Sequence, residues 1–167
     1  SLKAQIMNYE LMRPMFEAFQ ANKKNATGII QWMLNSSWPE MYWQLYDTFL
    51  RQNGAYYGAK KANEPLHLLY NYGDNSLYKI NDTLDNILDY KARVQVFDIN
   101  SKIIFNEEVN LSFSPESSEA FLKLPDLENV TNTYFLSLKL FDNKENEISN
   151  NFYWLSTKED ILDYEYE

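Results

Sequence analysis

The chain has 167 residues, of which 45% are hydrophobic and 23% are charged, and this composition excludes an intrinsically disordered or fibrous protein. Cysteine is absent, which excludes disulfides and thiolate metal sites, and with a single histidine, His67, we expect neither a metal ion nor a cofactor. The formal net charge of −9 argues against nucleic acid or an anionic membrane as a non-specific partner.

Two different compositions meet at Pro65. Residues 1–65 carry seven basic and five acidic side chains, whereas residues 66–167 carry eight and nineteen. All five methionines precede Pro65, and all four glycines lie at or before Gly73. The sequence therefore predicts two structural units with a boundary near residue 65.

The first unit is predicted to contain a helix, a strand and a second helix. Apolar positions recur at helical spacing from residue 2 to 21, although Pro14 should kink this helix or make it restart. Residues 28–34, GIIQWML, form a nearly continuous apolar run of the type that is buried on both faces of a parallel sheet. Residues 57–63 suggest a short helix. This order is typical of one slice of a parallel α/β sheet or barrel.

The second unit has the pattern of an all-β domain. Several segments alternate apolar and polar residues, as Val94 and Val96 do around Gln95. The predicted strands, separated by turn-forming residues, are 66–72, 76–81, 90–98, 103–113, 120–124, 134–141 and 147–155. Seven short strands in about a hundred residues predict an immunoglobulin-like antiparallel β-sandwich.

Residues 27–39, TGIIQWMLNSSWP, resemble the eighth barrel strand of glycoside hydrolase family 2, in the branch that holds exo-β-D-glucosaminidases and β-mannosidases. The resemblance continues through YYGAKKA at 56–62 and EPLH at 64–67, and it reappears in NDT at 81–83 and NFYWL at 151–155. Mannosidases often have Asp after the asparagine of the first motif, so Ser36 at that position favours the glucosaminidase side.

The resemblance implies a C-terminal fragment. Residues 1–65 would be the last helix-strand-helix part of a (β/α)8 TIM barrel, 66–156 the following immunoglobulin-like sandwich, and 157–167 a linker toward a further domain. The parent would be a retaining exo-acting β-glycosidase of the glucosaminide or mannoside type, with its two catalytic carboxylates on barrel strands that precede this chain. Residues 28–39 contain no acid, and we expect Glu40 and Asp47 to be solvated or capping residues. This chain is therefore expected to contain no catalytic residue and to be inactive alone.

Trp32 is the main candidate for contact with substrate. Barrel active sites lie at the C-terminal ends of the strands, and the resemblance implies a tryptophan on the eighth strand beneath the sugar. A flat indole suits the C–H face of a pyranose, although barrel core is the alternative role. Asn35 and Trp38 are further substrate-binding candidates, with loop fixing and loop packing as their alternatives. His67, near the boundary, is expected to hold the sandwich against the barrel.

Two other functions remain open for the sandwich. It could be a free-standing carbohydrate-binding module whose exposed aromatic residues stack on glycans, or it could be a structural spacer within the enzyme. The expected partners are a β-linked oligosaccharide and the rest of the parent polypeptide. Residues 1–65 should also leave an apolar surface through which the isolated chain self-associates.

Overall fold

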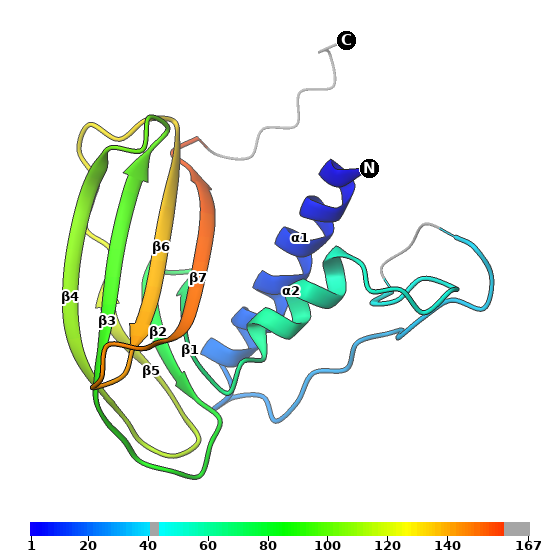
Figure 1. The fold of residues 1–167 in the computed structure, drawn as a ribbon, viewed down its shortest axis with the longest axis horizontal. Helices are drawn as coiled ribbons and strands as arrows, with labels where there is room; N and C mark the ends of the chain where they lie inside the picture. The colour runs from blue at the N-terminus through cyan, green and yellow to red at the C-terminus, as the bar shows by residue number, and fades with distance from the viewer. Residues whose placement is uncertain (41–43, 159–167) are drawn as a thin grey trace.

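A computed structural model describes residues 1–40 and 44–158 of the chain. The helices α1 (Leu2–Ala21) and α2 (Gly54–Ala62) pack side by side and lie against one flank of a two-sheet sandwich (Figure 1). Most of the linker expected at 157–167 lies outside the described residues.

Seven antiparallel strands form the sandwich, as the sequence predicts. One sheet has the order β1-β2-β5 and the other the order β4-β3-β6-β7. The strands are β1 (Leu66–Asn71), β2 (Ser76–Asn81), β3 (Ile87–Asp98), β4 (Ile103–Phe113), β5 (Ser117–Lys123), β6 (Thr133–Phe141) and β7 (Glu147–Ser156). The immunoglobulin-like sandwich is therefore confirmed.

The sandwich core follows from the alternation of the strands. Val94 and Val96 of β3 and Leu136 and Leu138 of β6 are completely buried between the two sheets. Because successive side chains of a strand point to opposite faces, the intervening residues lie on the outward face of the four-stranded sheet. This outward face is the side of the sheet that meets solvent.

The helix α1 is continuous through Pro14, without the restart that the sequence suggested. Pro14 cannot donate a hydrogen bond to the carbonyl one turn earlier. The neighbouring residues Met12, Arg13, Phe16 and Glu17 are buried on both sides of the proline, so tertiary packing offsets the lost bond. Packing therefore overrides the local preference for a break.

Two glycines allow α2 to approach α1 closely. A Cβ atom built on Gly54 would lie 1.9 Å from the carbonyl oxygen of Gln5, and one on Gly58 would lie 2.7 Å from the carbonyl oxygen of Tyr9. A small apolar core lies between the helices, and it consists of Met12, Phe16, Ala55, Ala59 and Ala62.

Residues 28–34 do not form the buried strand that the sequence predicted. Within the described residues no strand pairs with this segment, and the bridge nearest to it joins the following residue, Asn35, to Tyr46. Ile30 is 89% exposed and Leu34 is 59% exposed. A strand is stabilised by hydrogen bonds to a neighbouring strand, and no described segment provides that neighbour. The strand prediction is therefore wrong for this structure.

Candidate functional site

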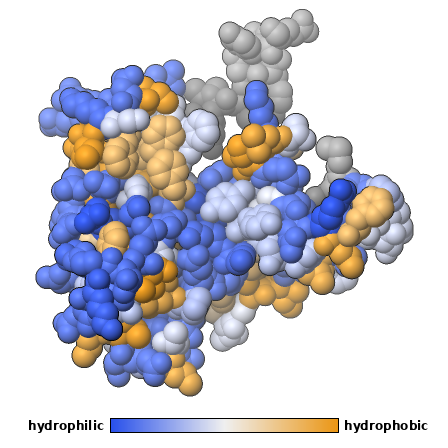
Figure 2. Space-filling model, in the orientation of Figure 1, coloured by the Kyte–Doolittle hydropathy of each residue, from blue (hydrophilic) through white to orange (hydrophobic). Residues whose placement is uncertain are grey.

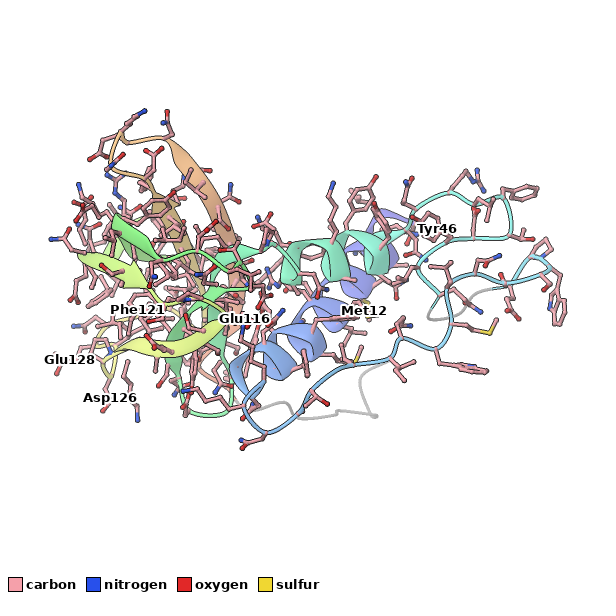
Figure 3. All side chains as sticks on the ribbon, turned by 90° about the horizontal axis from the view of Figure 1, so that it is seen from below. Met12, Tyr46, Glu116, Phe121, Asp126 and Glu128 are labelled. Carbon is pink, nitrogen blue, oxygen red and sulfur yellow. The ribbon has the colours of Figure 1, made fainter. Side chains whose placement is uncertain are left out.

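The candidate substrate-binding residues lie in the long segment between α1 and α2. This segment leaves α1 beside the sandwich and runs outward past the helices, and Tyr46 lies close to the start of α2 (Figures 1 and 3). Leu34 anchors its far end, because the carbonyl oxygen of Leu34 accepts hydrogen bonds from the amides of Leu45 at 3.1 Å and Tyr46 at 3.0 Å. The candidate site is thus at the end of the helix pair that is remote from the sandwich.

Trp32 and Trp38 present most of their surface to solvent. The exposed fractions are 74% for Trp32 and 66% for Trp38, so neither side chain is core. Asn35 is partly buried and its Nδ2 donates a hydrogen bond to the carbonyl oxygen of Ser36 at 3.4 Å. No ring contact or side-chain hydrogen bond joins these three residues to one another in the part of the chain that the structure describes.

Asp47 fixes the turn that leads into α2. Its Oδ1 accepts hydrogen bonds from the amides of Phe49 at 2.8 Å and Arg51 at 3.0 Å, and its Oδ2 accepts one from the Arg51 side chain at 2.7 Å. The backbone hydrogen bond from Arg51 lowers the pKa of the Asp47 carboxyl, which is therefore ionised in neutral solution. This geometry supports a structural role for Asp47.

A polar hollow of about 680 Å³ lies between the first turns of α1 and this turn. Gln5, Asn8, Glu40 and Asn53 are among the residues that line it. Amide and carboxylate groups of this kind can hydrogen-bond to sugar hydroxyls. Sequence analysis missed this hollow, because its residues lie on segments about forty positions apart.

A buried polar seam joins α1 to β7. We use the term polar seam for Arg13, Glu17, Asn151 and Tyr153, which are all at most 3% exposed. Glu17 Oε1 accepts hydrogen bonds from Asn151 Nδ2 at 2.7 Å and from the Tyr153 hydroxyl at 2.9 Å. Arg13 Nη1 donates to Asn151 Oδ1 at 3.1 Å, and the guanidinium lies 4.2 Å from the centroid of the Tyr153 ring.

Burial dominates the electrostatics of the polar seam. It raises the pKa of the Glu17 carboxyl from its usual value to about 7, although the nearby Arg13 guanidinium acts in the opposite direction. Burial also raises the pKa of Tyr153 well above its usual value. Arg13 and Glu17 fall one helical turn apart on the buried face of α1, which is the sequence signal that could have revealed the seam.

His67 has a structural position at the start of the sandwich. Its ring is 1% exposed, and Nδ1 lies 2.5 Å from the carbonyl oxygen of Glu64. Burial lowers the pKa of the His67 imidazole, so the ring is neutral in neutral solution. This geometry gives His67 a structural role at the start of β1, and its expected role in holding the sandwich against the barrel stays a prediction.

The described residues contain no cluster of three or more His, Asp or Glu side chains that could hold a metal ion. Asp82 pairs with Lys23 at 2.5 Å and accepts a hydrogen bond from Gln20. Over residues 1–40 and 44–158, neither helix combines the length and the hydropathy that crossing a membrane requires.

Comparison with known protein families identifies the sandwich. Residues 73–158 match the family described as Mannosidase Ig/CBM-like domain. This chain belongs to that family. It is also 40% identical to an exo-β-D-glucosaminidase of Streptomyces avermitilis, over 97% of this chain and 19% of the relative.

Solved structures agree with this assignment. The exo-chitosanase CsxA of Amycolatopsis orientalis superposes with a TM-score of 0.90 at 37% identity, over 97% of this chain and 20% of CsxA. The β-D-mannosidase of Dictyoglomus thermophilum shares the fold, with a TM-score of 0.76 at 22% identity over 91% of this chain and 19% of that enzyme. The resemblance to the exo-β-D-glucosaminidase and β-mannosidase branch of glycoside hydrolase family 2 is therefore confirmed, and the chain spans about a fifth of the length of these relatives.

Proposed function

We propose that this chain is part of a retaining exo-acting β-glycosidase that removes β-linked glucosamine units. The support is the match to exo-β-D-glucosaminidases along 97% of this chain, which includes the segment with Trp32 as well as the sandwich. Retaining hydrolysis uses two carboxylates about 5 Å apart, and we place both of them in a part of the parent enzyme outside this chain. The isolated chain is then inactive.

We propose that residues 1–65 complete the barrel of that enzyme, that 66–156 are its sandwich and that 157–167 lead to a further domain. In this arrangement Trp32 forms part of the wall of the sugar site. Its large exposed ring surface supports this role, because a sugar would cover apolar area that is otherwise in water. Asn35 and Trp38 contribute from the same loop.

A chimaeric enzyme tests this function. The matching segment of the Streptomyces avermitilis exo-β-D-glucosaminidase is replaced by this chain, and release of glucosamine from chitosan oligomers is measured. We expect an active chimaera in which Trp32→Ala lowers kcat/KM about 100-fold, that is by about 3 kcal/mol of transition-state stabilisation. Phe49→Ala is the matched control, because Phe49 is an equally exposed ring (70%) of the same loop and should leave the activity unchanged. A folded but inactive chimaera, or an unaffected Trp32→Ala variant, contradicts the proposal.

A further inference from the structure

The sandwich carries a second group of aromatic side chains, which is separate from the Trp32 loop. Phe97 pairs with Phe135 across β3 and β6, and Phe135 pairs with Trp154 across β6 and β7. Residues paired in this way lie on the same face of a sheet. Because Leu136 and Tyr153 point into the core, these rings point outward.

Phe152 lies on the same outward face, two residues before Trp154 on β7. We call Phe97, Phe135, Phe152 and Trp154 the aromatic strip. Phe135 and Phe152 stack with centroids 5.5 Å apart and an interplanar angle of 21°, and the Phe135 and Trp154 centroids are 5.8 Å apart. These mutual contacts hold the rings in place without burying them, since Phe152 is 51% exposed and Trp154 is 61% exposed.

Hydrogen-bonding side chains border the aromatic strip. Ser137 faces Phe152 across β6 and β7, and Asn150 follows on the same face of β7. Asn150 Nδ2 donates to Glu147 Oε1 at 2.6 Å, and Glu147 also pairs with Lys139 at 2.8 Å. Figure 2 shows hydrophobic side chains gathered over the upper part of this face, among mainly hydrophilic ones. An apolar strip with an amide and a hydroxyl at its border matches the two kinds of surface that a sugar ring presents, C–H faces and hydroxyl edges.

The negative charge of the sandwich favours positively charged sugars over neutral ones. Residues 66–158 carry eight basic and fourteen acidic side chains, so the sandwich has a net negative charge that attracts cations. A β-linked glucosamine oligomer bears ammonium groups in mildly acidic solution, whereas its N-acetylated counterpart is neutral. We propose that the aromatic strip is a binding surface for β-linked glucosamine oligomers. This proposal rests on the proposed function, because it assigns to the sandwich the same substrate class that the intact enzyme hydrolyses.

Calorimetric titration of the 167-residue chain with a β-1,4-linked glucosamine hexamer at pH 6 tests the proposal. We expect Trp154→Ala and Phe152→Ala each to weaken binding at least tenfold, and Trp154→Phe to retain most of it. Phe49→Ala should bind as the wild type does. Because Phe152 and Trp154 are more than half exposed, the variants should fold, and circular dichroism checks this. Affinity should fall as salt is added, and the N-acetylated hexamer should bind more weakly.

Trp32→Ala separates this inference from the proposed function. It should leave the binding of the hexamer by the isolated chain unchanged while impairing the chimaeric enzyme, and Trp154→Ala should leave the hydrolysis of a glucosamine dimer unchanged. An inactive chimaera with intact hexamer binding overturns only the proposed function. Absence of hexamer binding by the folded wild type, or equal binding by Trp154→Ala, overturns the aromatic strip as a sugar site. The sugar site is also overturned if a variant of the aromatic strip changes the oligomeric state in light scattering but not the binding of the hexamer. The aromatic strip would then be an interface with a second copy of the chain.

Discussion

At the scale of single residues, Glu17 links the stability of the fold to pH. Its carboxyl has a pKa of about 7 in the folded chain, whereas its usual value is 4.5. Between these two values the folded chain holds a proton that the unfolded chain has released, so the free energy of unfolding falls as pH rises. His67 acts in the opposite direction, because its lowered pKa removes stability as pH falls. The contribution of Glu17 must therefore be isolated by substitution.

We expect Glu17→Gln to remove this pH dependence. The neutral amide keeps the size of the side chain and cannot ionise, so the wild type should lose up to about 3 kcal/mol relative to the variant as pH rises from 5 to 8. Urea denaturation at several pH values measures this difference. Glu128→Gln, at an exposed position, is the control, and its free energy of unfolding should change with pH as that of the wild type does. A constant difference between the wild type and Glu17→Gln would mean that Glu17 is ionised throughout.

The residues of the two candidate sugar surfaces differ in how far sequence could find them. Trp32 and Asn35 were found only through resemblance, since a tryptophan in an apolar run has the same pattern whether it is core or exposed. The aromatic strip was not predicted residue by residue. In the folded sheet, Phe135, Phe152 and Trp154 lie opposite the core, and the cross-strand register that brings their rings together is a property of that sheet.

At the scale of secondary-structure elements, the pairing of α1 with α2 depends on glycine. Gly58 would place a Cβ atom 2.7 Å from the Tyr9 carbonyl oxygen and 3.1 Å from the Arg13 amide nitrogen. Both atoms are backbone, so a rotamer change cannot relieve the contact. Neither Gly54 nor Gly58 has a positive φ, which makes the requirement for glycine purely steric.

Gly58→Ala should therefore destabilise the chain even though alanine favours helix more than glycine does. We expect a loss of about 2 kcal/mol, the usual scale for overpacking an interface, in thermal or urea denaturation. Gly28→Ala is the matched control, because a Cβ there meets nothing within 4 Å, and its stability should change by less than about 0.5 kcal/mol. Equal stability of the two variants would show that α2 moves away from α1 at no cost.

Some sequence patterns were sufficient to predict the secondary-structure elements, and others were not. Regular alternation defined the seven strands, because each sheet buries one face, and the structure differs mainly at the strand ends. β5, for example, begins at Ser117 rather than residue 120. Residues 28–34 failed as a strand prediction because an apolar run specifies burial without specifying the neighbour that provides it. α1 was predicted correctly apart from the break at Pro14. The helix continues there because residues on both sides of the proline pack against segments that are distant in sequence.

At the scale of the whole molecule, one face of α1 has no partner among the described residues. Leu2, Met7, Leu11 and Met15 are between 52% and 77% exposed on it. We expect the isolated chain to form a dimer or a larger species through residues 1–65. Light scattering should show the double variant Met7→Glu, Leu11→Glu shifted toward monomer. Leu84→Glu, at a 78% exposed position of the sandwich, should leave the oligomeric state unchanged. A monomeric wild type at high concentration would refute this surface as an interface.

The polar seam has a practical consequence for anyone who moves this sandwich into another protein. The hydrogen bonds from Asn151 and Tyr153 to Glu17 have fixed directions, so α1 can occupy one orientation on β7 without breaking them. A transplant cut at residue 65 would remove Glu17, which accepts hydrogen bonds from both Asn151 and Tyr153. The transferable unit therefore begins at α1, and a graft that carries this helix should keep the native angle in a new host.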